Sequence, residues 1–333
     1  SEHSWPEARE RHGAMTEVSA TGTPMMVLTG TANPALAERI AEELGQPLCE
    51  VTVKRFADGE IFVRIDENVR GRDVFVIQPT SPPGDNTLEL LLLIDAAKRA
   101  SAARVTAVVP YFGYARQDRK DQPRVSIAAK LMANLIVAAG ADRLITIDLH
   151  QHQLQGFFDI PVDHLYASPV FMEHYRSTDK EDFVVVATDV GAAKMARGYA
   201  KRMGAGLAII DKRRSGPNVA EVVNVVGEVE GRRCLIPDDM VDTAGTMVNA
   251  VEALHERGAT EVYCIATHPL LSGPAVERLS GADIVEIAVT DTVAISEEKR
   301  TALPNLVEVS VAPLLARAIE STHYNRSVSK LFD

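Results

Sequence analysis

Apolar and polar residues follow two periods along the chain, and the two alternate from residue 25 onward. Short apolar runs bounded by turn residues predict buried strands, whereas apolar positions three and four residues apart predict amphipathic helices. The predicted strands span 27–29, 74–78, 105–110, 144–149, 183–187, 207–210, 234–236, 262–266 and 284–289, and the predicted helices span 35–44, 87–100, 127–139, 192–203 and 247–254. This alternation predicts an α/β fold with helices on both faces of parallel sheets.

The length of the chain and a similarity between two of its stretches favour two similar domains. A chain of 333 residues exceeds one typical core. The stretches AAKRASAARVTAVVP and EALHERGATEVYCIATHP each end a helix and begin a strand that stops at a proline, although ordinary βαβ units also produce such similarities. We expect a poorly ordered extension (1–23), an N-terminal α/β domain (24–167) and a C-terminal α/β domain (168–333), with the last helix packing back on the first domain.

The charge and the cysteine content indicate which kinds of partner and which cellular compartment are compatible with the sequence. The net charge of −11 argues against a nucleic-acid binder, so any phosphate must be held by a local basic cluster. No apolar run approaches the ~18 residues that span a bilayer. Three cysteines without a CxxC pair give no disulfide or zinc framework, and residues 1–23 lack the apolar segment of a secretory signal. These features predict a cytoplasmic protein that binds neither nucleic acid nor membrane.

The stretch 233–246 carries the most specific chemistry. A short apolar run predicts a buried strand, and a loop that begins with Asp238 and Asp239 is predicted to follow it. Small residues then precede a predicted helix. Free N–H groups at a helix start favour an anion, while the carboxylates would repel phosphate and instead suit sugar hydroxyls or a metal. The combination predicts a phosphorylated ribose. The alternative is an ordinary strand-to-helix turn in which Asp242 or Thr243 caps the helix.

Two basic stretches follow predicted strands, where α/β folds bind their ligands. One is the run Asp211 to Arg214, which concentrates three cations in an acidic protein and suits a transferring phosphoryl group. The other, 111–120, combines aromatic residues that can sandwich a base with guanidinium groups that can clamp phosphates. Its polar continuation to residue 126 predicts a mobile lid. For both stretches the alternative is a solvated charged surface.

A candidate metal site follows the strand at 144–149. Asp148, His150 and His152 alternate there and are predicted to face one way, and Asp189 follows the strand at 183–187. One histidine and one carboxylate suit a divalent cation near phosphates. A zinc site with both histidines is the alternative, but it lacks a clear third soft ligand. His152 by itself is best explained as a structural residue.

Seven motifs together resemble those of the ribose-phosphate pyrophosphokinases, in the phosphate-activated, ADP-inhibited class. The similarity runs from about residue 25 to 332, nearly the whole chain. The motifs are FADGE at 56–60, RGRDVFVIQPT at 70–80, VVPYFGYARQDRK at 108–120, DLHQHQLQGFFDIP at 148–161, ATDVGAAK at 187–194, DKRR at 211–214 and DDMVDTAGT at 238–246. Many phosphoribosyltransferases share the last motif. The sequence departs from the pattern at Pro237, which is unwelcome in a central strand, and at His152.

The resemblance implies that the chain transfers a diphosphoryl group from ATP to the C1 hydroxyl of ribose 5-phosphate with release of AMP. The product, 5-phosphoribosyl 1-diphosphate, would serve nucleotide, histidine and tryptophan biosynthesis. It also implies a Mg²⁺ cofactor, assembly as a homohexamer with ATP reaching across a dimer interface, and allosteric effects of phosphate and ADP.

The resemblance also implies a role for individual residues. ATP would contact Phe56, Asp58, Gly59, Glu60, Arg116 and Gln117. Mg²⁺ would be held by His150 and Asp189. Lys212 and Arg214 would be catalytic, with Arg214 also touching ribose 5-phosphate. Asp238 and Asp239 would bind the ribose hydroxyls. The 5-phosphate would be bound by Asp242, Thr243, Ala244, Gly245 and Thr246.

Two other functions remain as alternatives. A phosphoribosyltransferase shares the phosphate loop but needs a nucleobase as co-substrate and neither the FADGE turn nor the YARQDRK loop. A catalytically silent regulatory subunit, like the synthetase-associated proteins, would carry an insertion in the mobile loop and altered catalytic residues. Here the loop is not extended, and Lys212 and Arg214 are present.

Overall fold

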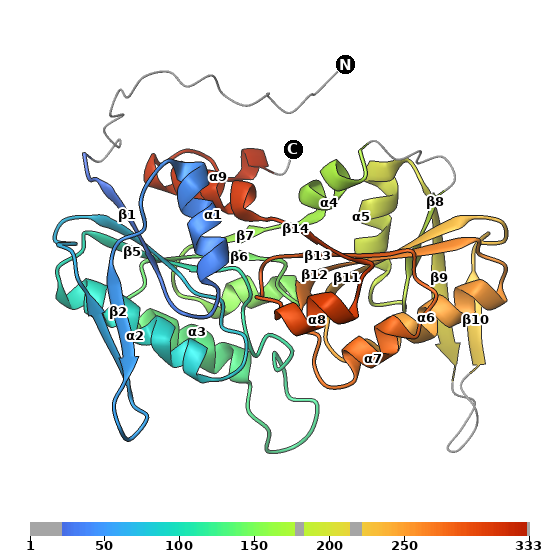
Figure 1. Cartoon of the computed structure of the whole chain (residues 1–333), viewed down its shortest axis with the longest axis horizontal. Coiled ribbons are helices and arrows are strands. Elements are labelled where there is room, and N and C mark those ends of the chain that lie inside the picture. The colour runs from blue at the N-terminus through green and yellow to red at the C-terminus, as the bar shows by residue number, and fades with distance from the viewer. Residues whose placement is uncertain (1–21, 177–182, 214–221, 332–333) are drawn as a thin grey trace.

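Two α/β halves lie edge to edge in the computed structural model (Figure 1), which describes residues 22–176, 183–213 and 222–331. The first half contains a five-stranded sheet in the order β1-β4-β5-β6-β7, with all strands parallel. Its strands are β1 (Met25–Thr29), β4 (Asp73–Ile77), β5 (Arg104–Val109), β6 (Arg143–Ile147) and β7 (Val162–Leu165). Its helices are α1 (Pro34–Leu44), α2 (Asp85–Arg99), α3 (Ala128–Ala139) and the 3-10 helix η1 (His152–Phe157).

The second half contains a seven-stranded sheet in the order β10-β9-β8-β11-β12-β13-β14. Its strands are β8 (Phe183–Ala187), β9 (Gly206–Arg213), β10 (Val222–Val226), β11 (Arg233–Val241), β12 (Glu261–Pro269), β13 (Glu286–Thr290) and β14 (Leu306–Val309). Its helices are α4 (Ser168–His174), α5 (Ala193–Met203), α6 (Gly245–Glu256), α7 (Ala275–Ser280), α8 (Glu297–Ala302), α9 (Ala312–His323) and η2 (Ser329–Leu331). The predicted α/β architecture is confirmed. The second sheet is mixed, however, because the edge strand β10 runs antiparallel to β9.

Helices cover both faces of the two sheets in shared layers. One apolar cluster joins α1, α4, α5 and α9 across the upper layer of Figure 1, so it underlies both halves. Separate clusters lie under α2 and α3 in the first half and under α6 and α7 in the second. Helix α9 packs against α1, and His323 Nδ1 lies 2.7 Å from Asp73 Oδ2 of the first sheet. The domain limits at 24–167 and 168–333 stay predictions.

Local sequence signals explain where the helices begin and end. At the start of α1, the Asn33 side chain accepts a hydrogen bond from Leu36 N (3.2 Å), and Pro34 occupies the first turn. Gly45 ends this helix in the left-handed region with φ of 62°, where glycine is tolerated without strain. The Asn33 amide also donates to Asp291 O (2.7 Å), so this cap ties α1 to the second half.

Two strands of the second sheet are longer than the sequence predicted, and both extensions carry candidate residues. Strand β9 continues to Arg213 because it pairs with β10, so Asp211 to Arg213 lie in a strand and not in a turn. Strand β11 continues to Val241 because its pairing with β12 does not stop at the acid pair. The predicted acidic loop is therefore wrong. Pro237 lies beyond Leu235, where the pairing with β8 ends, and stays in register with Ile265 of β12, so proline does not end this strand.

Candidate active site

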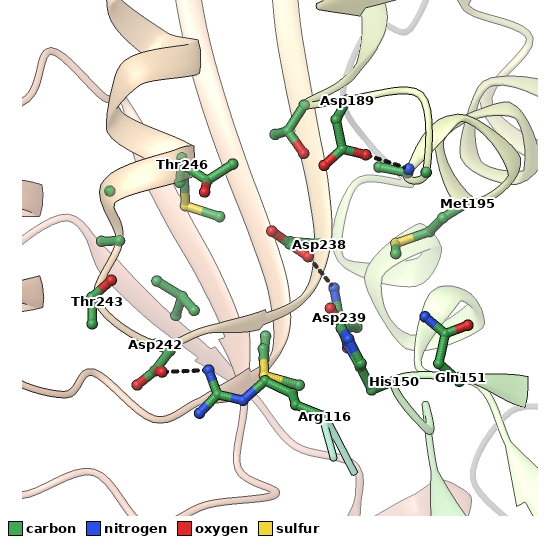
Figure 2. A pocket seen from close by; sticks show the side chains of 18 residues that line it. Arg116, His150, Gln151, Asp189, Met195, Asp238, Asp239, Asp242, Thr243 and Thr246 are labelled. Atoms are coloured by element: carbon green, nitrogen blue, oxygen red, sulfur yellow. Dashed lines mark hydrogen bonds and ion pairs between the residues drawn. The ribbon is translucent and has the colours of Figure 1, made fainter. Parts of the chain in front are cut away.

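A cavity of about 440 Å³ lies at the carboxyl ends of β8 and β11, where α/β folds place their ligands (Figure 2). The end of β11 and the start of α6 form one wall. The loop after β8 and the first turn of α5 form another, and the segment after β6 closes the cavity from the first half. Predicted residues that line it are Arg116, His150, Asp189, Asp238, Asp239, Asp242, Thr243, Ala244, Gly245 and Thr246. The acids and the small-residue loop therefore share one space.

The start of α6 presents uncapped N–H groups to the cavity. Ala244 precedes the helix with φ of 60°, and its methyl side chain offers no oxygen to cap it. The alternative in which Asp242 or Thr243 caps α6 is therefore wrong. Instead, the Thr243 carbonyl accepts a hydrogen bond from Arg278 Nη1 (2.9 Å), which fixes the loop from outside the cavity. Free N–H groups at the positive end of a helix make a ready anion site.

The two adjacent acids of β11 perturb each other strongly. Burial, a hydrogen bond with Asp239 and its negative charge together raise the pKa of Asp238 to about 8. Burial alone would also raise the pKa of Asp239, but hydrogen bonds from His150 and Asp238 hold it below its usual value. His150 Nδ1 lies 2.8 Å from Asp239 Oδ2, and this hydrogen bond raises the pKa of His150. The two carboxyls are therefore not both ionised at neutral pH in the ligand-free protein, and the charge on Asp239 is paired with His150.

The chemistry of these donors fits a magnesium ion. Asp189 sits on the opposite wall, where its Oδ1 accepts a hydrogen bond from Ala192 N (2.8 Å). Magnesium prefers oxygen ligands and usually keeps several waters, so one or two protein ligands suffice. Across the described ranges, no set of three His, Cys, Asp or Glu side chains is arranged as a complete metal site.

The prediction that Asp148, His150 and His152 face one way is wrong. Strand β6 ends at Ile147, and Asp148 turns the chain with φ of 37°. Its carboxylate accepts hydrogen bonds from Ala167 N (3.0 Å) and Thr267 Oγ1 (2.7 Å). Of the three, only His150 lines the cavity.

His152 begins η1, and its ring lies 5.3 Å from that of His164 and 5.7 Å from that of Tyr166. This aromatic packing supports the structural explanation of His152.

Arg116 stands between this cavity and a second one. Its Nη1 lies 2.6 Å from Asp242 Oδ2, so a residue of the first half contacts the small-residue loop of the second (Figure 2). The second cavity, of about 500 Å³, is lined by Gln117, Tyr114 and Lys299 and shares Arg116 and Asp242 with the first. A ligand that extends from one cavity toward the other would meet the Arg116 guanidinium.

The structure does not bring all predicted site residues together within one chain. Phe56, Asp58, Gly59 and Glu60 form the exposed tip of the hairpin between β2 (Val51–Arg55) and β3 (Ile61–Ile65), and they line neither of the two cavities. Figure 1 shows this hairpin at the far end of the first half.

Only one of the two predicted catalytic residues lies in the described part of the chain. Lys212 lies in β9 opposite Val223, and Arg214 lies outside the described residues.

The sequence pattern missed several residues of the cavity. Gln151, Thr188 and Met195 also line it. Thr188 and Gln151 adjoin predicted ligands, so strand-end position could have identified them. Met195 lies in the first turn of α5 and gave no comparable signal.

The fold and the site define a two-sheet α/β protein in which an open helix start and a carboxylate pair share one cavity. Residues 25–140 match the model of the N-terminal domain of ribose phosphate pyrophosphokinase, and residues 215–333 match the phosphoribosyl synthetase-associated domain. The chain belongs to the ribose-phosphate pyrophosphokinase family.

Relatives and a solved structure cover nearly the whole chain. A ribose-phosphate pyrophosphokinase of Chlorobaculum tepidum is 52% identical over 312 residues, which cover 93% of this chain and 96% of the relative. The enzyme of the same name from Burkholderia pseudomallei is 53% identical, with 92% and 97% covered. The crystal structure of phosphoribosylpyrophosphate synthetase from Mycobacterium smegmatis superimposes with a TM-score of 0.84 at 45% identity, covering 91% of this chain and 100% of that one.

Proposed function

We propose that this chain transfers a diphosphoryl group from ATP to the C1 hydroxyl of ribose 5-phosphate, giving 5-phosphoribosyl 1-diphosphate and AMP. The product would supply nucleotide, histidine and tryptophan biosynthesis. Family membership supports the reaction, and the observation that carries it structurally is the single cavity joining an uncapped helix start to a carboxylate pair. These two features recognise the two ends of a phosphorylated pentose.

In this proposal, ribose 5-phosphate binds with its phosphate at the start of α6. The backbone N–H groups of residues 242–246 would hold the phosphate, and the hydroxyls of Thr243 and Thr246 would add donors. Asp238 and Asp239 would accept hydrogen bonds from the ribose hydroxyls. Accepting such bonds favours the ionised carboxylate, so ribose binding would lower the raised pKa of Asp238.

We further propose that the triphosphate of ATP binds across the space between the two halves. Arg116 and Gln117 would bind it on the side of the second cavity, where Arg116 already contacts a carboxylate. His150 and Asp189 would hold Mg²⁺, which when bound supplies positive charge to the diphosphoryl group. Both residues line the same cavity, which supports this assignment.

Lys212 and Arg214 are proposed as the catalytic cations. In the reaction, the C1 oxygen forms a bond to the β-phosphorus, the bond from that phosphorus to the α–β bridging oxygen breaks, and AMP leaves with the bridging oxygen. The C1 hydroxyl loses its proton. Cations that face the migrating group stabilise the charge that develops on its oxygens. The position of Lys212 in β9, two strands from β11 in the same sheet, supports this role.

The hairpin residues require a second subunit in this scheme. Phe56, Asp58, Gly59 and Glu60 are exposed at the tip of the hairpin and distant from both cavities, which supports a role in binding ATP on a neighbouring chain. We therefore propose that two chains share each ATP site. Assembly as a homohexamer, with phosphate and ADP as effectors, is proposed from membership of the family.

The compartment is proposed to be the cytoplasm. Cys49, Cys234 and Cys264 are buried free thiols, as expected in a reducing compartment. Within the described ranges, no helix has the length and apolar character needed to cross a bilayer.

The test is formation of AMP and 5-phosphoribosyl 1-diphosphate from ATP, ribose 5-phosphate and Mg²⁺, followed by ³¹P NMR. A phosphoribosyltransferase would instead consume 5-phosphoribosyl 1-diphosphate when given a nucleobase and would form no AMP from the first mixture. A silent subunit would be inactive in both mixtures. Either of these results would refute the proposed function.

A further inference from the structure

Two buried residues of the second sheet contact the segment of the first half that carries His150. Thr267 and His268, at the carboxyl end of β12, are 1% and 2% exposed. Thr267 Oγ1 donates a hydrogen bond to Asp148 Oδ2 (2.7 Å), and His268 Nε2 lies 3.1 Å from the Asp148 carbonyl oxygen. Asp148 precedes His150 by two residues. The two halves therefore meet at this point through specific hydrogen bonds.

We propose that Thr267 and His268 are positioning residues, which hold segment 148–150 so that His150 stays in contact with Asp239 in the substrate cavity. The inference rests on the proposed function, because it assigns Asp239 to the ribose hydroxyls. Neither Thr267 nor His268 lines that cavity, so both act through other residues.

The hydrogen bonds fix the orientation of the His268 ring. A carbonyl oxygen only accepts, so Nε2 must carry the hydrogen that is shared with Asp148 O. Burial lowers the pKa of His268, so the ring is neutral and Nδ1 accepts from Thr292 Oγ1 at 2.9 Å. Thr290 Oγ1 meanwhile donates to Thr267 O at 2.6 Å. Both ring nitrogens thus have partners, and the ring cannot turn without breaking a buried hydrogen bond.

The geometry of Asp148 requires support from both sheets. Its φ of 37° is in the left-handed region, which is strained for a residue with a side chain. Its N–H donates to Leu165 O (3.0 Å) within the first half, while Thr267 and His268 hold its other end from the second. The His268 ring also packs edge-on against Tyr111, with ring centroids 4.9 Å apart. This bend directs His150 toward the cavity.

One rigid strand pair sets both contacts between the halves. In the ladder between β11 and β12, His268 is the partner of Met240, which directly follows Asp239. Segment 148–150 therefore touches β12 through Asp148 and β11 through His150. Any displacement at Asp148 changes the distance between His150 and Asp239, because the two strands cannot move independently.

Thr267→Val tests the proposal, because valine has the shape of threonine without its hydroxyl. With ATP and Mg²⁺ saturating, the KM for ribose 5-phosphate should rise about 3- to 10-fold, while kcat changes less than about twofold. Thr267→Ser, which keeps the hydroxyl, should restore the wild-type KM. The matched control is Thr146→Val: Thr146 is fully buried in β6, two residues before Asp148, and its Oγ1 has no partner within the described residues. This control should leave KM unchanged.

A second measurement separates positioning from general packing. In a His150→Ala background, Thr267→Val should have no further effect on KM, because the contact through which it acts is gone. An equal rise in both backgrounds, or an equal rise for Thr146→Val, would overturn the proposal. If Thr267→Val does not fold, His268→Gln and His268→Leu give the same comparison. Glutamine keeps the donor to Asp148 and should retain the wild-type KM better, and equal values for the two would again overturn the proposal.

Failure of this inference is distinguishable from failure of the proposed function. A wild-type protein that forms no AMP refutes the function. An active wild-type protein with an unchanged KM in Thr267→Val refutes only the positioning role.

Discussion

Asp238→Asn should change how the stability of the ligand-free protein depends on pH. The folded protein raises the pKa of Asp238 from 3.8 to about 8, so between these values the folded state holds a proton that the unfolded state has lost. Stability therefore falls as pH rises through this window, because unfolding releases a proton. Asparagine has the same shape and does not titrate, so the substitution should remove this dependence.

The size of the effect follows from the width of the window. Each pH unit within it costs the folded state up to about 1.4 kcal/mol, so the step from pH 5.5 to 8.0 costs at most about 3 kcal/mol. Water access and the neighbouring titration of Asp239 reduce this, and we expect about 1–2 kcal/mol. At pH 8.0 the variant should therefore be more stable than wild type without ligands, yet bind ribose 5-phosphate more weakly.

Urea unfolding at pH 5.5 and 8.0, with EDTA and a fixed protein concentration, measures the difference. Other groups also titrate in this range, but they are common to both proteins. The change in unfolding free energy between pH 5.5 and 8.0 is therefore determined for each protein, and the value for the variant is subtracted from the value for wild type. Asp159→Asn, at an exposed carboxyl, is the control and should behave as wild type. Equal pH dependence in wild type and Asp238→Asn would refute the argument that the buried pair is protonated without ligands.

The other predictions concern turnover and ligand affinity. Lys212→Ala should lower kcat about 100- to 1,000-fold, the loss typical of one preorganised transition-state donor, and near-normal turnover in a steady-state AMP assay would remove Lys212 from the catalytic role. His150→Ala should chiefly raise the magnesium concentration needed for half-maximal rate, and an unchanged titration would contradict the ligand role. Arg116→Ala should raise the KM for ATP about 10- to 100-fold, because a charge-assisted contact to the phosphates is lost, and an unaltered KM in ATP titrations would place the nucleotide elsewhere.

Local patterns were sufficient for the fold class and for the core of the site. The helix at 192–203 and the strand at 183–187 were predicted nearly to the residue. The helix buries residues at helical spacing, and the strand is a short, continuously buried apolar run. The helix that begins at residue 245 was predicted at 247–254, two residues late, because its first apolar position is residue 247.

The extent of β9 and β11 was not visible from local patterns. It depends on pairing with β10 and β12, and strand pairing is a tertiary property that a run of polar residues does not report.

Contacts between distant residues lie beyond any local signal. His150 and Asp239 are 89 residues apart, and Arg116 and Asp242 are 126 apart, yet each pair meets at the same cavity. Strand-end position predicted that such residues gather at one edge, but not which of them touch. The orientation of Asp148 away from the cavity depends on its own left-handed backbone conformation, which the residue type did not predict.

The acid pair shows why a destabilising arrangement can persist in a binding site. Two adjacent carboxylates in a buried strand cost free energy, and the raised pKa of Asp238 reflects that cost. Ribose hydroxyls would satisfy these oxygens in the proposed complex, so the cost is relieved only when the sugar is bound. The fold can hold the acids in place meanwhile because β12 pairs with Asp238 and Met240 on either side of Asp239, and Asp239 itself is hydrogen-bonded to His150. Selectivity for a phosphorylated pentose then follows from position, since the acids would repel any ligand that brought its phosphate to their end of the cavity.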